Sequence, residues 1–253
     1  KNKVSFEWDN DISFDELLIK SGIIPLPPYI KRNTESSDYL NYQTVYSKNN
    51  GSIAAPTAGL HFNNDLIDNL KKNQIIDFFT LHVGLGTFKP IKSENIENHT
   101  MHSEEIIINK ENILNIYNSK NITAVGTTSL RVLESIYYLG SIIEKEKYNY
   151  VISQKIIEKK LKLNLKESCK KIIDHLNFNK LNKLKFYSKI FIYPGYSFKV
   201  CDQLITNFHY PKSSLILLIA SFIGEDWRKV YKFAKEKKYR FLSYGDSSLL
   251  FRK

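Results

Sequence analysis

The hydrophobic and polar positions of the chain follow two periods, which predicts a mixture of helices and strands. Apolar residues three or four positions apart indicate helices, and short apolar runs bounded by turn residues indicate strands. Helices are expected over residues 13–20, 110–118, 128–139, 214–222 and 226–237, with another around residues 66–70. Strands are expected over residues 74–83, 104–108, 122–127, 189–193, 203–208 and 239–243. This alternation favours an α/β domain with short loops.

Capping residues mark where three of the helices begin. Ser13 followed by Glu16 forms a capping box, in which each residue satisfies a backbone N–H of the other. An asparagine at position 63 or 64 and a serine at 213 or 214 can cap two later helices. The helix after the serines is apolar on all sides, so we expect it to be buried.

The segment 141–190 differs in composition from the rest of the chain. It is rich in Lys, Ile and Asn and contains neither Pro nor Gly. We interpret it as helical, with a mobile stretch, and as an insertion within a main α/β domain that spans 1–253.

Composition excludes several classes of protein. The chain has 253 residues and 42% hydrophobic residues, which is enough for a sizeable core. The 16 Tyr and 15 Phe argue against a disordered chain, and two cysteines argue against a disulfide scaffold. The longest apolar stretch, Leu215 to Ile223, is too short to span a bilayer. We therefore expect no membrane association and a cytoplasmic location.

The net charge of +11 lies in the second half of the chain. Residues 1–140 carry 13 basic and 16 acidic residues, 141–190 carry 13 and 5, and 191–253 carry 11 and 5. A basic half of this kind attracts a polyanion such as RNA or DNA. The alternative is that lysine merely fills ordinary exposed positions in this chain.

The histidines gather in short segments that carry Gly, Pro, Thr or Asn. Five of the six lie in such segments: His61, His82, His99, His102 and His209. Imidazole titrates near neutrality, so a cluster of this kind supplies general acids and bases. For any single histidine, a structural role is the alternative. We expect no metal site, because the spacings HExxH and CxxC are absent.

Two further segments suggest contacts with an anion. Gly84, Gly86 and Thr87 resemble half of a nucleotide-binding loop, and a strand-ending turn explains them equally well. The run Thr127-Thr128-Ser129, with Arg131 on the first turn, places hydroxyls and a guanidinium at an expected helix N-terminus, where an anion binds well. Plain N-capping is the alternative there.

Taken together, these segments resemble the S-adenosylmethionine:tRNA ribosyltransferase-isomerase family of queuosine biosynthesis. PTAGLHF at 56–62 and LHVGLGTF at 81–88 are the most specific matches. The full set, in family order, is 24–30, 42–46, 54–62, 80–90, 99–104, 124–135, 192–222 and 239–246. The resemblance implies the family's main α/β domain, with a mixed sheet and flanking helices, and implies that the family's N-terminal part and its inserted β-rich domain are largely absent here.

The resemblance also implies a reaction. The ribosyl group of S-adenosylmethionine, a co-substrate rather than a cofactor, is transferred to 7-aminomethyl-7-deazaguanine in tRNA and isomerised. The products are epoxyqueuosine-tRNA, adenine and methionine. The reaction needs a base beside the sulfonium, an acid for the departing adenine and an anchor for the methionine carboxylate.

Residues in the matching segments are assigned to these roles by the resemblance. We expect His61, His82 or His102 to transfer protons, with Glu104 or Asp246 orienting a histidine. We expect Arg131, Thr127 and Thr128 to hold a carboxylate or phosphate. The remaining expected substrate contacts are Thr57, Gly59, Gly84, Gly86, Thr87, Ser129, Asn207, His209, Lys212 and Tyr244. The expected partner is tRNA bearing the 7-aminomethyl base, and the expected state is a monomer.

Two other interpretations stay open at this point. One is a catalytically impaired tRNA-binding fragment of the same family. The other is a metal-dependent hydrolase that uses the histidine cluster. The last matching segment also departs from the family, since Ser247 and Ser248 follow Asp246 where the family usually has Ala-Met.

Overall fold

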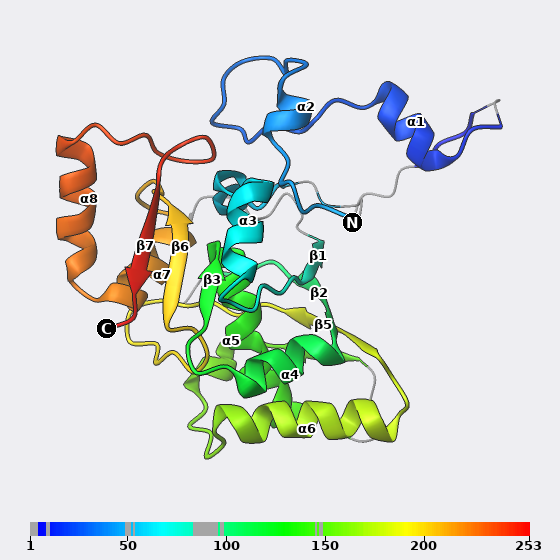
Figure 1. Ribbon diagram of the computed structural model, residues 1–253, viewed down its shortest axis with the longest axis vertical. Helices are drawn as coiled ribbons and strands as arrows, with labels where there is room; N and C mark the ends of the chain where they lie inside the picture. The colour runs from blue at the N-terminus through cyan, green and yellow to red at the C-terminus, as the bar shows by residue number, and fades with distance from the viewer. Residues whose placement is uncertain are drawn as a thin grey trace.

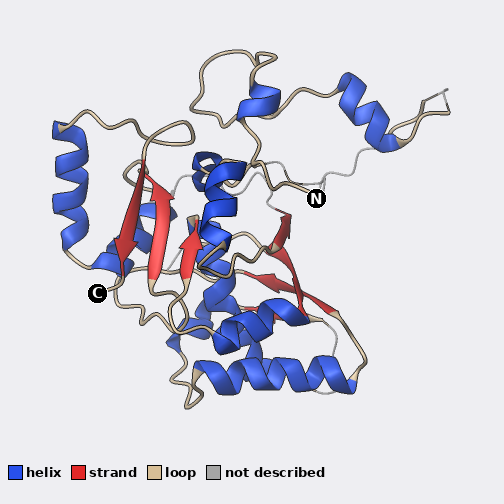
Figure 2. Ribbon diagram, viewed as in Figure 1, coloured by secondary structure: helices blue, strands red, loops and turns tan. Residues whose placement is uncertain are grey.

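Two small mixed sheets lie on either side of a long buried helix (Figures 1 and 2). The computed structural model describes residues 5–8, 11–48, 52, 54–82, 96, 99–144, 146 and 149–253. The helices are α1 (Phe14–Ser21), α2 (Asp38–Asn41), α3 (Asn64–Lys71), α4 (Lys110–Asn118), α5 (Thr127–Ile142), α6 (Leu165–Phe178), α7 (Ser214–Ile223) and α8 (Asp226–Glu236), with 3-10 helices η1 (Thr57–His61) and η4 (Gln154–Glu158). The strands are β1 (Thr80–His82), β2 (Glu104–Asn109), β3 (Thr123–Val125), β4 (Tyr150–Ile152), β5 (Lys183–Ser188), β6 (Gln203–Asn207) and β7 (Ser247–Phe251).

Each sheet combines parallel and antiparallel neighbours. The first has the order β1-β2-β5-β4, with β4 parallel to β5 and the other pairs antiparallel. The second has the order β3-β6-β7, with β3 parallel to β6 and β7 antiparallel to it. The expected α/β class with mixed pairing and flanking helices is confirmed, and the strands are divided between two sheets.

Helix α5 forms the centre of the core. Every residue from Leu130 to Gly140 is buried, so the helix is covered on all sides. It contacts β3 and β6 of one sheet, β4 of the other, and α6. Burial on this scale stabilises the fold mainly through apolar surface removed from water. It also fixes the position of the helix N-terminus.

The predicted helix starts are confirmed. The Ser13 hydroxyl accepts from the Glu16 N–H, and the Glu16 carboxylate accepts from the Ser13 N–H. The Asn63 side chain caps α3, and the Ser213 hydroxyl caps α7. Local side-chain hydrogen bonding thus determined where these helices begin. No helix in the described part of the chain is long and apolar enough to cross a membrane.

The prediction of a buried strand over 74–83 is wrong for most of that segment. Of residues 74–82, which the structure describes, only Thr80–His82 pairs, as β1, whereas Ile75 and Phe78 are exposed; Val83 lies outside the described residues. The Asp77 carboxylate instead accepts hydrogen bonds from the side chains of Asn112 and Asn115 on α4. The segment is therefore tied to a helix by polar contacts and leaves its apolar residues outside.

Two other strand predictions are misplaced by several residues. The strand expected at 189–193 lies earlier, as β5, and residues 190–192 are buried but belong to no strand. The last strand is β7 rather than 239–243. Residues 239–246 form a loop, because the Asn207 amide donates to the carbonyls of Leu242, Ser243 and Gly245.

The segment 141–190 is only partly helical. It supplies α6, but also β4 and β5, and β5 lies between β2 and β4 inside its sheet. Tyr150, Phe186 and Ile172 of this segment are fully buried in the core. The prediction of a helix with a mobile stretch is therefore wrong for β4 and β5, and the interpretation of the segment as an insertion stays a prediction.

Candidate functional site

Four of the sequence segments meet where the parallel strands β3 and β6 end. Gly126 follows β3 and leads into α5, and its N–H donates to the Ile205 carbonyl of β6. Helix η1, from the PTAGLHF segment, packs against β6, and the Ala58 Cβ lies 3.8 Å from where a Cβ on Gly126 would stand. The loop 240–246 is tied to the end of β6 by Asn207. Carboxyl ends of parallel strands are the usual place for a ligand in α/β sheets.

A fifth segment reaches the same helix through a buried charge cluster. The His102 Nε2 lies 3.1 Å from Glu104 Oε1, and the Arg131 Nη2 lies 3.3 Å from Glu104 Oε2. Glu104 is the first residue of β2, and Arg131 lies in the second turn of α5. Glu104 is 1% exposed and Arg131 is 6% exposed. The HTMHSE segment and the TTSLR segment therefore form one site.

The pattern of β2 explains why Glu104 is buried. Alternate residues of the strand face the core, so Glu104 shares its face with Ile106 and Ile108. A carboxylate in such a place is stable only when it is paired. Burial raises the pKa of the Glu104 carboxyl, but the charge of Arg131 and the hydrogen bond with His102 outweigh it, and the net shift is downward. Glu104 therefore stays ionised near neutral pH.

Arg131 has hydrogen-bonding capacity that the described residues do not use. Its Nε and Nη2 groups are buried and have no hydrogen-bond acceptor in the described part of the chain, since the contact with Glu104 is an ion pair only. Unsatisfied buried N–H groups are costly and rare in folded proteins. Thr127, Thr128 and Ser129 lie in the first turn of the same helix, where free backbone N–H groups and the helix dipole favour an anion. This end of α5 is therefore suited to a carboxylate or a phosphate.

The end of β6 carries buried polar groups of a different kind. The His209 Nε2 and the Thr206 hydroxyl are 3.0 Å apart and hydrogen-bonded. Burial lowers the pKa of His209 to about 4, so this ring is neutral at physiological pH. The Asn207 amide holds the 240–246 loop, and its Oδ1 has no partner among the described residues. His209 and Asn207 are thus buried residues whose hydrogen bonds hold the end of β6 and the 240–246 loop in place.

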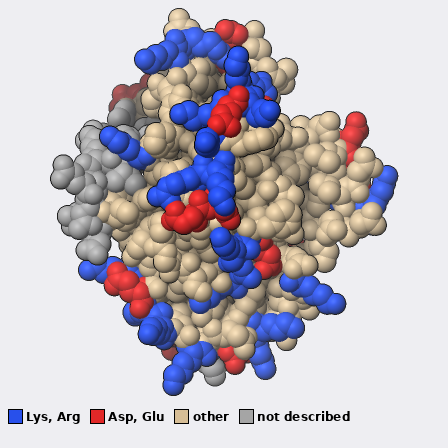
Figure 3. All heavy atoms as spheres, turned by 90° about the vertical axis from the view of Figure 1, so that its left-hand side faces the viewer, with Lys and Arg blue, Asp and Glu red and all other residues tan. Residues whose placement is uncertain are grey.

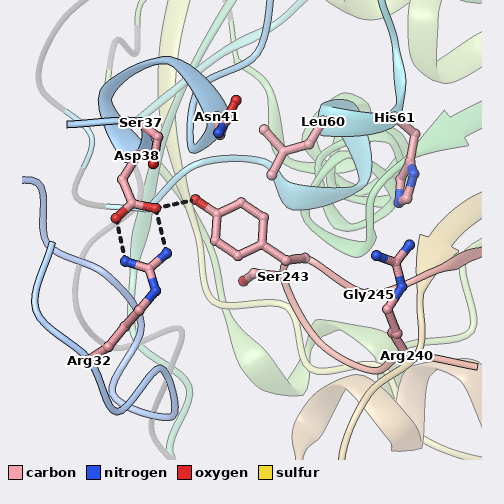
Figure 4. Close-up of a pocket in the computed structure, with 10 residues that line it drawn as sticks. Arg32, Ser37, Asp38, Asn41, Leu60, His61, Arg240, Ser243 and Gly245 are labelled. Carbon is pink, nitrogen blue, oxygen red and sulfur yellow. Dashed lines mark hydrogen bonds and ion pairs between the residues drawn. The ribbon is translucent and has the colours of Figure 1, made fainter. Parts of the chain in front are cut away.

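An open cavity of about 430 Å³ lies between α2, η1 and the 240–246 loop (Figure 4). His61 and Arg240 point toward each other across one side of it. The other side is formed by Arg32, Asp38 and Tyr244. Segments about 200 positions apart in the chain thus line one polar hollow with two guanidinium groups, an imidazole and a phenol.

An ion pair between the exposed Arg32 and the buried Asp38 carboxylate fixes the second side of this cavity. Two guanidinium nitrogens of Arg32 contact the two carboxylate oxygens of Asp38 at 2.6 and 2.8 Å, and the Tyr244 hydroxyl donates to Asp38 Oδ1 at 2.8 Å. The hydrogen bond from Arg32 holds the pKa of the Asp38 carboxyl well below its usual range. Burial and the bond to Asp38 raise the pKa of Tyr244 to about 12. Tyr244 is therefore a neutral, well-oriented ring at this surface.

Arg32 and Asp38 are not among the residues expected from the sequence to contribute to the site. One signal was present, since Arg32 is one of only five arginines in a chain with 37 basic residues. An arginine kept where lysine is common indicates a need for two-point bonding. The structure adds one more link, a hydrogen bond between the Tyr29 and Ser243 hydroxyls, which ties the 24–30 segment to the same loop.

Of the two carboxylates expected to orient a histidine, only Glu104 bonds a histidine ring among the described contacts. The Asp246 carboxylate accepts from the Arg240 backbone N–H at 2.8 Å and from the Arg240 guanidinium at 2.6 and 3.1 Å. Asp246 therefore closes the 240–246 loop. The hydrogen bonds from Arg240 lower the pKa of the Asp246 carboxyl, and the nearby His61 adds to this shift without a described hydrogen bond to Asp246.

The remaining candidates fall at different places. His82 stands opposite Glu105 in the β1–β2 pair, so it lies on the sheet face away from Glu104. Gly59 is buried, and a Cβ there would meet the Tyr46 hydroxyl. Thr57 begins η1, and Lys212 lies exposed in a turn with φ 59°. Gly84, Gly86 and Thr87 lie outside the described residues.

The comparisons with known proteins agree with the sequence motifs. The family model described as "Queuosine biosynthesis protein" matches residues 1–250. The chain belongs to this family. A relative from Halothermothrix orenii named S-adenosylmethionine:tRNA ribosyltransferase-isomerase is 41% identical over 253 residues, which is 98% of this chain and 62% of the relative. A relative of the same name from Rickettsia bellii is 43% identical over 258 residues, which is 99% of this chain and 62% of the relative.

This chain therefore spans about 62% of the length of these relatives. A solved structure, that of the S-adenosylmethionine tRNA ribosyltransferase from Thermotoga maritima, is 29% identical and covers 76% of this chain and 50% of its own, with a TM-score of 0.48. The names of the relatives give no support to a metal-dependent hydrolase. Within the described ranges, no group of three His, Cys, Asp or Glu side chains is arranged to hold a metal ion.

Proposed function

We propose that this chain carries the site at which the ribosyl group of S-adenosylmethionine is transferred to 7-aminomethyl-7-deazaguanine in tRNA and isomerised. The products are epoxyqueuosine-tRNA, adenine and methionine. The observation that carries the proposal is the buried cluster of His102, Glu104 and Arg131 at the N-terminus of α5. It combines a proton-transfer pair with an anion anchor, both of which the reaction needs. The proposed setting is the cytoplasm, where tRNA is modified, and S-adenosylmethionine is a co-substrate.

Arg131 is proposed to anchor the methionine carboxylate. Its Nε and Nη2 groups are buried and lack hydrogen-bond acceptors among the described residues. A carboxylate in front of them would accept the missing hydrogen bonds, and a charge-assisted pair of this kind is strong. The first turn of α5, with Thr127 and Thr128, adds backbone N–H donors to the same anion.

His102 is proposed to be the base that takes a proton from the carbon beside the sulfonium. Glu104 bonds its Nε2, which fixes the ring and stabilises the imidazolium that forms. Because Arg131 also contacts Glu104, binding of the carboxylate and orientation of the base depend on one buried group. His61, exposed at the cavity, is the proposed acid for the departing adenine.

The test is a product assay on purified protein. The chain is incubated with S-adenosylmethionine and tRNA bearing the 7-aminomethyl base, and adenine and epoxyqueuosine are measured. In parallel, a chimeric chain adds the part of the Halothermothrix orenii relative that this chain does not match. Products from either protein support the proposal, and products from the chimera alone mean that the rest of the family's length is needed. Absence of products from both, with tRNA still bound, would refute catalysis and leave a tRNA-binding fragment.

A further inference from the structure

The last turn of α8 and the loop that follows it expose basic and aromatic side chains together. We call this the C-terminal basic surface and define it by Phe233, Lys235, Lys237, Lys238, Tyr239 and Arg240. Figure 3 looks onto the side of the molecule that α8 occupies and shows Lys and Arg side chains over much of this face, with fewer Asp and Glu between them. The surface therefore has a positive potential, which attracts polyanions.

The lysines of this surface form no ion pairs with other described residues of the protein. Earlier along α8, the basic residues are paired one turn away, as in Lys229 with Asp226 and Lys232 with Glu236. Lys235, Lys237 and Lys238 form no ion pair with any residue that the structure describes. Their charges are available to a partner, and a phosphate backbone is the partner that repeated exposed lysines fit best.

Two exposed aromatic side chains, Phe233 and Tyr239, flank these lysines in the sequence. Phe233 is 50% exposed and Tyr239 is 41% exposed, and their rings meet edge to face at 6.1 Å. The Lys237 ammonium lies 5.9 Å from the centre of the Phe233 ring. Exposed rings interleaved with cations are the arrangement on which single-stranded nucleic acids stack their bases. A paired duplex keeps its bases stacked inside and would not use the rings.

The surface continues into the cavity that contains His61. Tyr239 donates its N–H to the Ala234 carbonyl of α8, and Arg240 next to it lines the cavity. The ion pair of Arg240 with Asp246 holds the two ends of the intervening loop together. A strand bound along residues 233–240 would therefore lead to the cavity where His61 is the proposed acid.

We propose that the C-terminal basic surface binds a single-stranded segment of RNA and delivers one of its nucleotides to the cavity at His61. This inference rests on the proposed function. It assigns RNA binding to the C-terminal basic surface, although basic residues occur along much of the chain. The basic residues of 141–190 are excluded from this role. Helix α6, which carries Lys166, Lys170 and Lys171, lies at the end of the molecule away from α8 and the cavity (Figure 1).

The test compares two triple variants that remove the same charge. One is Lys235→Gln, Lys237→Gln, Lys238→Gln. The control is Lys159→Gln, Lys160→Gln, Lys162→Gln, which changes three exposed lysines just before α6. The probe is a fluorescently labelled RNA stem-loop with the anticodon-arm sequence and an unmodified guanine, titrated at several salt concentrations. Thermal melting checks that each variant is folded.

The first variant is expected to raise the Kd by about tenfold or more and to reduce the slope of log K against log salt by about 2. The control is expected to change the Kd by less than about threefold, since it removes only long-range attraction. Phe233→Ala is expected to raise the Kd by about fivefold or more without changing the salt slope, because stacking releases no counterions.

Three results would overturn the inference. They are absence of binding by the unaltered chain, equal losses in the two triple variants, or equal affinity for the stem-loop and for a fully paired duplex of the same length. The binding assay needs no turnover, so its outcome is separate from that of the proposed function. If adenine is released and the two triple variants bind alike, the surface assignment alone fails. If no adenine is released but binding depends on Lys235, Lys237 and Lys238, the catalytic proposal alone fails.

Discussion

Glu104 is the residue on which the candidate site depends most. Its strand position would ordinarily hold an apolar side chain like those of Ile106 and Ile108. The carboxylate is tolerated there because Arg131 and His102 pair with it. Its neighbour Glu105 faces the other side of the sheet, where it bonds the Tyr187 hydroxyl at 2.7 Å. Two adjacent glutamates thus have opposite environments and provide a matched pair for mutation.

Glu104→Gln is expected to destabilise the fold by about 3 kcal/mol, because Arg131 is left as a buried charge without its counterion. Glu105→Gln is expected to cost less than about 1 kcal/mol, since that pair is partly exposed. Urea denaturation of both variants measures the difference. Equal losses would contradict the buried ion pair.

The same carboxylate predicts an acid-dependent loss of stability. The pKa of Glu104 in the folded protein lies below the unfolded value of 4.5. Its contribution is therefore present above about pH 4.5 and is lost as the pH falls through the lower folded pKa. Unfolding midpoints measured at several pH values below 5 are expected to fall more steeply for the unaltered chain than for Glu104→Gln. Parallel curves would argue against the shift.

His209 predicts a second pH effect in a higher window. Burial lowers its folded pKa to about 4, while its unfolded value is 6.5. The unfolded chain therefore binds the extra proton first as the pH falls, and stability is lost between about pH 6.5 and 4. The full shift corresponds to at most about 3 kcal/mol. His209→Gln keeps a hydrogen-bonding group near Thr206 and is expected to flatten this part of the stability profile. A slope unchanged by the substitution would mean that another group titrates.

At the scale of elements, the sequence predicted helices better than strands. Caps such as Ser13, Asn63 and Ser213 act on their own helices, so nearby residues were sufficient to locate them. The strand predictions failed at 74–79 and 239–243. Each of these segments is instead hydrogen-bonded to residues that are distant in the sequence. Asp77 is bonded to α4, and Asn207 is bonded to the 240–246 loop. The pattern of a short apolar run does not contain information about hydrogen bonds to residues so distant in the sequence.

The 240–246 loop is compact enough to require glycine at position 245. A Cβ there would lie 2.5 Å from the Phe241 carbonyl carbon and 2.6 Å from the Arg240 carbonyl oxygen, both backbone atoms. Gly245→Ala is therefore expected to displace the loop, to cost about 2 kcal/mol of stability and to lower activity by moving Tyr244 and Arg240. Ser248→Ala, which removes an atom from the adjacent strand, is the control. If Gly245→Ala keeps both stability and activity, the loop is not a fixed wall of the cavity.

At the scale of the whole molecule, the fold brings five sequence segments to one end of α5. The strand-end rule accounts for the meeting of the segments that follow the parallel strands β3 and β6. It could not predict that Asp38 and Tyr244, 206 positions apart, are hydrogen-bonded, because nothing local in either segment specifies the other. It also could not separate His82 from His102. That separation depends on the register of β1 with β2, which is set by the folded sheet.

The measurement that tests this account most directly is adenine release from S-adenosylmethionine in the presence of tRNA bearing the 7-aminomethyl base, compared between Glu104→Gln and Glu105→Gln. Both substitutions are made in the chain, or in the chimera if only the chimera is active. We predict that Glu105→Gln releases adenine at nearly the unaltered rate and that Glu104→Gln is slower by about 100-fold or more, because it loses the orientation and charge support of the base. Equal rates for the two variants, with both folded, would contradict the proposed role of the His102–Glu104–Arg131 cluster.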